Sequence, residues 1–273
     1  MSRKIRSAFV AIAAIAALGL TSCAADSSAE VAPEDGSLGT LKVGALQTPA
    51  GDILEYITDA AAEDGLTIEF VPFTDYNTPN TALADGSVDA NLFQNVVFLN
   101  TFNKNAGEDL VSVGQAYLPS AAFYSEKIES LDDLADGATV AIPNDTTNGG
   151  RALELLASAG LIEVEDGVTG PAGVTANPKN LKFKEIENAT LPQALPDVDT
   201  AFITSSFALP AGLTAEDGIF VEGEDSKYYN VLATRPELKD DARIVALYDL
   251  LTAQSTADFI TKEWSGLIVP VVR

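Results

Sequence analysis

The sequence predicts an α/β fold made of two lobes with a ligand cleft between them. Three observations lead to this prediction. Short apolar runs typical of strands alternate with amphipathic runs typical of helices, which indicates open and largely parallel sheets. The alternation restarts in the middle of the chain, and an extended run near residue 230 precedes two further amphipathic helices. Ligands of proteins built in this way bind between the lobes.

The first α/β block begins at residue 41. Its predicted strands and helices, in chain order, are residues 41–46, 52–63, 66–72, 76–84, 88–93 and 96–105. The first of the helices places Ile53, Leu54 and Ile57 on one face, and Gly65 follows its end.

The second block follows two extended runs, residues 110–118 and 121–124, which Pro119 separates. Ser130 before Leu-Asp-Asp is typical of a helix start. The later predicted elements are residues 139–142, 148–159, 181–186, 200–203, 228–234, 239–253 and 256–264. We therefore assign residues 41–120 and 229–273 to lobe I and residues 121–228 to lobe II.

The N-terminal segment predicts export and lipidation. Residues 3–6 are mainly basic, residues 8–20 are apolar, and Cys23 follows Leu-Thr-Ser. This apolar run is shorter than the roughly 20 residues of a membrane-spanning helix and has the layout of a secretory signal. Leu-Thr-Ser-Cys resembles the lipobox of bacterial lipoproteins. We expect residues 1–22 to be a signal peptide, Cys23 to carry acyl chains such as palmitate, and residues 23–40 to be a flexible tether. An ordinary signal peptide is the alternative.

The composition excludes several classes of function. The chain has 273 residues, with 16 Lys+Arg, 40 Asp+Glu and no His, and a net charge of -24. Without His, there are no His-dependent triads or His metal sites, and so large a negative charge argues against a nucleic-acid partner. Its acidic clusters do not match a calcium loop, and no nucleophile or phosphate-loop motif appears. We expect no catalytic residue, no metal and no cofactor.

Arg151 is the leading candidate for a ligand-binding residue. The predicted strand 139–142 runs into a polar turn, and the helix predicted after it has Arg151 in its first turn. Free N–H groups at a helix start and a guanidinium together make a site for a carboxylate or phosphate. Gly149 and Gly150 permit close approach of the backbone. In the alternative interpretation, Arg151 pairs with an acid on its own helix, for example Glu154.

Amide and aromatic side chains gather where the strand near residue 93 meets the next helix. Phe93 and Phe98 are candidates to line an apolar pocket, and Gln94 or Asn95 to orient a polar ligand group. Alternatively, the aromatic side chains are core and the amides cap the helix. Tyr76 follows another predicted strand, at the sheet edge where ligands usually bind.

Several stretches match one family. Two of these stretches are the most specific. One is Asp-Ala-Asn-Leu-Phe-Gln at residues 89–94, and the other is Pro-Asn-Asp at residues 143–145 followed by Asn148 and Arg151. On these residues the chain resembles the NlpA/MetQ family, the lipoprotein substrate-binding components of methionine-type ABC importers. The resemblance implies a periplasmic-binding-protein-like fold whose lobes close over one amino acid. It also implies a lipid-anchored monomer on the extracytoplasmic face of the cell membrane, with an ABC permease and its ATPase as partners.

The resemblance also implies which residues bind the ligand. Arg151 would hold the ligand carboxylate, Asn230 would bond the polar end of the amino acid, and Tyr76 and Phe93 would enclose its side chain. Three further positions differ from the usual residues of the family, which has His, Tyr and Asn where this chain has Asn95, Phe98 and Thr204.

The expected ligand is methionine. Another apolar amino acid or a short peptide is the alternative within the family. A secreted hydrolase that uses two carboxylates, and a lipoprotein that only scaffolds a surface assembly, are the alternatives from other classes.

Overall fold

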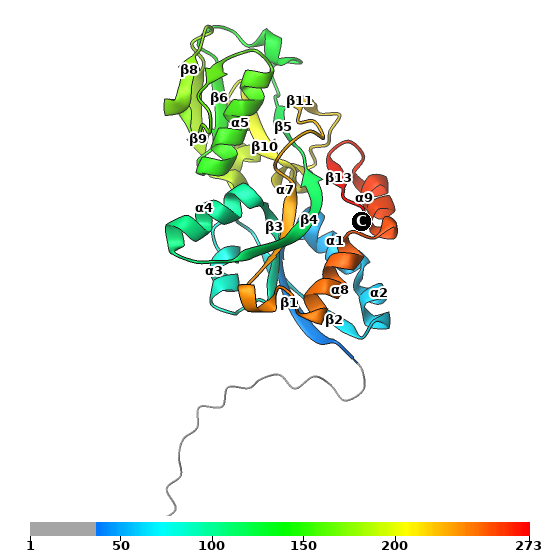
Figure 1. Ribbon diagram of the computed structural model, residues 1–273. Helices are drawn as coiled ribbons and strands as arrows, with labels where there is room; N and C mark the ends of the chain where they lie inside the picture. The colour runs from blue at the N-terminus through cyan, green and yellow to red at the C-terminus, as the bar shows by residue number, and fades with distance from the viewer. Residues whose placement is uncertain (1–36) are drawn as a thin grey trace, which may run out of the picture. The chain divides into compact units, whose positions relative to one another are not determined.

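The computed structural model describes residues 37–273, which belong to one compact unit (Figure 1). Two main sheets with helices packed beside them form this unit, so the predicted α/β class is confirmed. The predicted signal peptide, Cys23 and the tether up to residue 36 lie outside the described residues. Within residues 37–273, no helix is both long enough and apolar enough to cross a membrane.

Sheet A collects six strands from the first and last parts of the chain. They are β1 (Gly39–Leu46), β2 (Leu66–Phe73), β3 (Ala90–Asn95), β4 (Val111–Pro119), β12 (Asn230–Thr234) and β13 (Ile268–Pro270). Their order across the sheet is β13-β4-β12-β3-β1-β2. β1 pairs in parallel with β2 and β3, whereas β12 is antiparallel to β3 and β4. Every residue of β3 is buried, as expected for a central strand covered on both faces.

The helices beside sheet A come from both ends of the described chain. They are α1 (Asp52–Tyr56), α2 (Thr58–Glu63), α3 (Pro79–Ala84), α4 (Val96–Ala106), α8 (Ala242–Leu251) and α9 (Gln254–Trp264). Ile53 and Leu54 of α1 share one buried cluster with Leu247 of α8. The helix predicted over residues 52–63 is interrupted at Ile57, whose ψ of -2° departs from the roughly -42° of a regular α-helix.

Sheet B collects five strands from the middle of the chain. They are β5 (Ala121–Tyr124), β6 (Thr139–Pro143), β9 (Lys182–Ile186), β10 (Thr200–Thr204) and β11 (Gly218–Val221), in the order β11-β5-β10-β6-β9. Val140 and Ile142 enter one buried cluster, whereas Ala141 between them enters another. This alternation is the two-residue period of a strand with a core on each face.

Shorter elements complete this part of the chain. The helices are α5 (Thr146–Ser158), α6 (Leu191–Ala194) and α7 (Ser205–Ala208), and β7 (Glu163–Val164) pairs with β8 (Val174–Ala176). The helix start predicted at Ser130 is only a single 3₁₀ turn, although the Ser130 hydroxyl does accept a hydrogen bond from the Asp132 N–H. Other short turns of this kind lie at Pro171–Gly173, Asn188–Thr190, Leu195–Asp197, Leu209–Ala211 and Pro236–Leu238.

The chain passes between the two sheets at two places. Ser120 alone separates β4 of sheet A from β5 of sheet B, and residues 222–229 lead from β11 back to β12. These two connections lie side by side, because the Glu222 N–H donates to the Ala121 carbonyl at 2.9 Å. Residues beside these connections contribute to the site described next.

Candidate functional site

A small cavity lies between elements of the two sheets. All seven residues that were predicted to bind a ligand line it, together with three others. The sheet A side supplies Tyr76, Phe93, Gln94, Asn95, Phe98, Pro119 and Asn230, and the sheet B side supplies Asn148, Arg151 and Thr204.

One wall of the cavity is aromatic. The ring of Tyr76 lies 5.8 Å from that of Phe93 and 6.2 Å from that of Phe98, and the Phe93 and Phe98 rings are 5.7 Å apart in an edge-on arrangement. Phe207 of α7 packs behind this wall, 5.0 Å from the Tyr76 ring. Phe207 was not among the residues predicted to line the site. Its only signal in the sequence is its place four residues after the predicted strand 200–203. Such a wall favours contact with an apolar ligand side chain.

Tyr76 also bonds across the cavity. Its hydroxyl lies 3.0 Å from the hydroxyl of Thr204, and either group can be the donor. A phenol is protonated near neutral pH, and removal from water raises the pKa of Tyr76 further above its ordinary value of 10.0. The two hydroxyl groups therefore form a neutral hydrogen bond between an element beside sheet A and the last residue of β10.

Asn95 caps α4 and also lines the cavity. Its Oδ1 accepts a hydrogen bond of 3.0 Å from the Phe98 N–H. Its Nδ2 makes no hydrogen bond to any residue in the described part of the chain, so this amide nitrogen is free to donate to a ligand. The capping and ligand-binding interpretations of this residue are therefore compatible.

Gln94 belongs to a closed network of buried amides. Its Oε1 accepts from Asn80 Nδ2 at 2.7 Å, and its Nε2 donates to Asn80 Oδ1 at 2.6 Å and to Asn91 Oδ1 at 3.0 Å. Asn91 Nδ2 in turn donates to Asn80 Oδ1 at 2.9 Å. Buried amides are stable when their groups are paired in this way. Of the two amides proposed to orient a ligand, Asn95 is the one with an unpaired group.

The predicted start of the helix that carries Arg151 is wrong. Helix α5 begins at Thr146, so Arg151 lies in its second turn. The side chain of Asp145 caps the helix by accepting from the N–H groups of Thr147 and Asn148 at 3.1 and 2.8 Å. These N–H groups are already bonded, so the anion site expected from free N–H groups beside Arg151 is absent from this helix start.

The two glycines of α5 serve helix packing. A Cβ atom at Gly149 would lie 2.8 Å from the carbonyl oxygen of Pro143, and one at Gly150 would clash with the carbonyl oxygen of Val168. The close backbone approach predicted at these glycines is therefore between α5 and its own neighbouring segments. It positions the next residue, Arg151, against the cavity.

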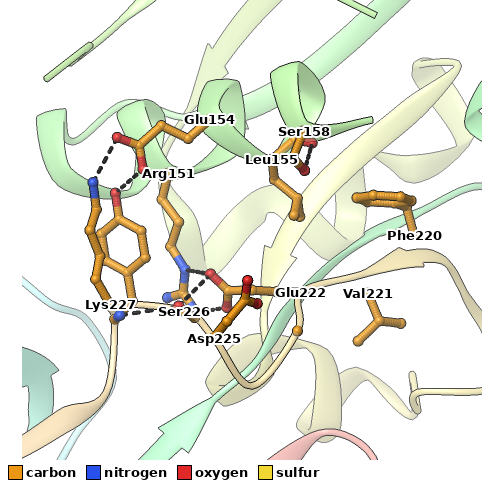
Figure 2. Close-up of a pocket in the computed structure, with 12 residues that line it drawn as sticks. Arg151, Glu154, Leu155, Ser158, Phe220, Val221, Glu222, Asp225, Ser226 and Lys227 are labelled. Atoms are coloured by element: carbon orange, nitrogen blue, oxygen red, sulfur yellow. Dashed lines mark hydrogen bonds and ion pairs between the residues drawn. The ribbon is translucent and has the colours of Figure 1, made fainter. Parts of the chain in front are cut away.

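Arg151 pairs with an acid that the sequence did not indicate. Its Nε donates to Glu222 Oε1 at 2.9 Å, and its Nη2 donates to Glu222 Oε2 (Figure 2). Nη2 also donates to the Pro119 carbonyl at 2.8 Å. The guanidinium lies 4.8 Å from the centre of the Tyr228 ring. The alternative pairing with Glu154 is wrong, because Glu154 bonds Lys227 and Tyr228 instead, each at 2.8 Å.

Unpaired polar groups remain at the cavity. Asn230 Nδ2 donates to the Tyr117 hydroxyl at 3.3 Å, and Asn148 Nδ2 bonds Asp145, but the Oδ1 atoms of Asn230 and Asn148 accept no hydrogen bond from a residue within 37–273. Arg151 Nη1 likewise has no such partner. The cavity therefore offers a guanidinium N–H pair for a carboxylate and amide oxygens for an ammonium group.

The described residues place neither a metal site nor an acid pair at this cavity. No group of three or more His, Cys, Asp or Glu side chains is placed to hold a metal ion within the described residues. A hydrolase that uses two carboxylates would need two acids facing each other across the cleft. Of the residues that the structure describes, no Asp or Glu lines the cavity.

Comparisons with known proteins agree over nearly the whole described chain. A family model described as NlpA lipoprotein matches residues 41–272. D-methionine-binding lipoprotein MetQ of Escherichia coli is 40% identical over 267 residues, which cover 94% of this chain and 95% of that protein.

Two solved structures are similar in fold and in sequence. An ABC transporter periplasmic substrate-binding protein from Coxiella burnetii has a TM-score of 0.82 and 38% identity, and the match covers 85% of this chain and 100% of that one. A nutrient binding protein from Burkholderia cenocepacia, solved bound to methionine, has a TM-score of 0.81 and 35% identity, with 84% and 99% covered.

Proposed function

The chain belongs to the NlpA lipoprotein family, and from this premise we propose that it captures methionine outside the cytoplasm and delivers it to the permease of an ABC importer. In this proposal the protein binds and releases its ligand unchanged and performs no catalysis. The names of its relatives, D-methionine-binding lipoprotein MetQ and a nutrient binding protein bound to methionine, support the choice of ligand.

The observation that carries the proposal is the polarity of the cavity. One side has the rings of Tyr76, Phe93 and Phe98, and the other has the Arg151 guanidinium with free amide oxygens. An amino acid with an apolar side chain has the same division between a charged end and an apolar end. The thioether of methionine is flexible and polarizable, so it adapts well to aromatic walls.

The polar groups at the cavity favour one amino acid over a short peptide. A peptide bond would add polar groups that need partners of their own, whereas the groups left free at the cavity match one carboxylate and one ammonium group. We propose that Arg151 holds the ligand carboxylate, that Asn95 and Asn230 bond its polar groups, and that Thr204 acts through Tyr76.

The proposed transport cycle uses the two sheets as the cores of two lobes. In it, residues 41–120 and 229–273 form lobe I, residues 121–228 form lobe II, and the lobes close over the ligand. A lipid on Cys23 and a tether over residues 23–40 would hold the monomer at the outer face of the membrane, where the tether raises its effective concentration near the permease and its ATPase.

The test is a calorimetric titration of the purified protein with L-methionine, D-methionine and a panel of other amino acids. We expect saturable heat with at least one methionine stereoisomer. No heat with either stereoisomer would contradict the proposal, and saturable heat with leucine or isoleucine alone would favour the alternative of a different apolar ligand. Native mass spectrometry of the same preparation checks whether a methionine co-purifies.

A further inference from the structure

Glu222 holds Arg151 from the side that faces away from the cavity. Only 3% of the Arg151 side chain and 8% of the Glu222 side chain are exposed. Figure 2 shows the Arg151 side chain extending from α5 to Glu222, on the segment that follows β11. A second pocket, here called the outer pocket, is lined by residues that include Arg151, Glu154, Glu222, Lys227 and Tyr228. Arg151 lines both the outer pocket and the cavity, whereas Glu222 lines the outer pocket and not the cavity. The acid therefore contacts the cation without facing a ligand in the cavity.

The carboxylate of Glu222 is itself fixed by its neighbours. Its Oε2 accepts from the Ala121 N–H at 3.2 Å, and its Oε1 accepts from the Ser226 hydroxyl at 2.9 Å. Each oxygen thus has a second partner besides Arg151. A carboxylate held at both oxygens fixes the plane of the guanidinium that it binds, since the two hydrogen bonds of such a pair are parallel.

This arrangement leaves one defined part of Arg151 for a ligand. A guanidinium has five N–H donors. Glu222 occupies Nε and Nη2, and the Pro119 carbonyl also binds Nη2. Nη1 makes no hydrogen bond to another described residue, so its two N–H groups are the ones available to a ligand.

Glu222 also balances the charge at the cavity. Among the described residues that line the cavity, Arg151 is the one with a formal charge. Asp145 is a further nearby carboxylate, but it caps α5, where the positive end of the helix dipole faces it, and it accepts hydrogen bonds from Asn148 and Asn188. The buried pair of Arg151 and Glu222 is neutral as a unit, so an anion entering the cavity meets no net positive charge.

We propose that Glu222 is a positioning residue that makes the cavity selective for zwitterionic ligands over anionic ones. The inference rests on the proposed function, because it assumes an amino acid in this cavity. A zwitterion brings no net charge and uses both Arg151 Nη1 and the free Oδ1 atoms of Asn148 and Asn230. An anion that lacks the ammonium group leaves those oxygens without a donor and adds an unbalanced charge.

The test compares methionine with its deamino analogue, γ-methylthiobutyrate, which keeps the side chain and the carboxylate but is an anion. In calorimetric titrations of the wild-type protein, we expect methionine to bind at least about tenfold more tightly than the anion. Equal affinities would overturn the inference without any variant. A wild-type protein that binds neither compound would instead contradict the proposed function, so the two failures are distinguishable.

The variant Glu222→Gln removes the charge and keeps the length of the side chain. We expect the preference for methionine over the anion to fall by about tenfold, because the anion then meets an unbalanced Arg151. Equal loss of affinity for both ligands would indicate a structural role alone and would overturn the inference. An unchanged preference would overturn it as well.

Two further variants separate charge from folding. Glu222→Asp keeps the charge, so it should keep most of the preference. Glu154→Gln removes an acid of the same outer pocket that bonds Lys227 and Tyr228 rather than Arg151, and the wild-type preference should remain. A loss of preference in Glu154→Gln as large as in Glu222→Gln would contradict a specific role of Glu222. If Glu222→Gln does not fold, the wild-type comparison and Glu222→Asp still decide the question.

Discussion

The hydroxyl groups of Tyr76 and Thr204 lie 3.0 Å apart, although the two residues are 128 positions apart in the chain. Tyr76 lies between β2 and α3 on the sheet A side, and Thr204 ends β10 of sheet B. Because both residues line the cavity, their bond joins the two sides of the site directly. In the proposed closure of the two lobes, this bond is a contact that closing would form and opening would break.

Tyr76→Phe should weaken methionine binding by about 0.5–1.5 kcal/mol, since it removes this one hydrogen bond and keeps the ring contacts. The measurement is calorimetric titration. Tyr56→Phe is the matched control, because the Tyr56 hydroxyl donates to the Ser255 carbonyl at 3.3 Å, away from the cavity. Equal affinities of Tyr76→Phe and the wild type would contradict a role of this bond in closure.

Two substitutions of Asn95 separate its role as the cap of α4 from its proposed role in ligand binding. Asn95→Ser keeps a side-chain oxygen that caps α4 but loses the free amide nitrogen, whereas Asn95→Ala loses both. We expect Asn95→Ala to lower the free energy of unfolding by about 1 kcal/mol and Asn95→Ser to leave it nearly unchanged. Both should bind methionine more weakly. Wild-type affinity in Asn95→Ser would show that the amide nitrogen does not contact the ligand.

Tyr124 has a buried hydroxyl that finds no hydrogen-bond partner among residues 37–273. Tyr124→Phe should therefore stabilise the protein by about 1 kcal/mol, because it removes a buried polar group that folding strips of water. Tyr117→Phe is the matched comparison and should destabilise, since the Tyr117 hydroxyl accepts from Asn230 Nδ2. Urea denaturation measures both. A less stable Tyr124→Phe would mean that this hydroxyl does have a partner.

Stability should decline at alkaline pH. Burial raises the pKa of Tyr76, Tyr117, Tyr124 and Tyr228 above the ordinary 10.0, and for Tyr228 the hydrogen bond to Glu154 adds to the effect of burial. The unfolded chain loses these protons near pH 10 while the folded chain keeps them, so this contribution to stability is present below pH 10 and is lost as the pH rises above it. The urea concentration at the midpoint of denaturation should therefore decrease as the pH is raised from about 10 to about 11. A constant midpoint over that interval would contradict the expected burial of the phenols.

The sequence was sufficient for the features that depend on local pattern. Strand β1 and the order of strands and helices follow from hydrophobic periodicity, and the candidate residues at the junction of β3 and α4 do line the cavity. Arg151 does line the cavity, but the reason for which it was predicted is partly wrong. Helix α5 starts earlier than expected, and Asp145 accepts hydrogen bonds from the N–H groups at its start.

Features that depend on distant parts of the chain were not predictable in this way. Glu222 lies 71 positions from Arg151, in a chain with many acids, and no periodicity relates the two residues. The same limit applies to Phe207, which meets Tyr76 only after both sheets have formed. Gly149 and Gly150 signalled close backbone approach, but only the tertiary structure shows that the approaching groups belong to Pro143 and Val168.

Titration of Arg151→Lys with methionine tests the central claim most directly. Lysine keeps the positive charge that balances Glu222 but lacks the planar fork that offers Nη1 to a ligand. We predict that the affinity for methionine falls at least about tenfold, the loss expected for hydrogen bonds to a charged group. Lys227→Ala, which removes an exposed cation paired with Glu154 in the outer pocket, should keep wild-type affinity. Wild-type affinity in Arg151→Lys would contradict the claim that Arg151 holds the ligand.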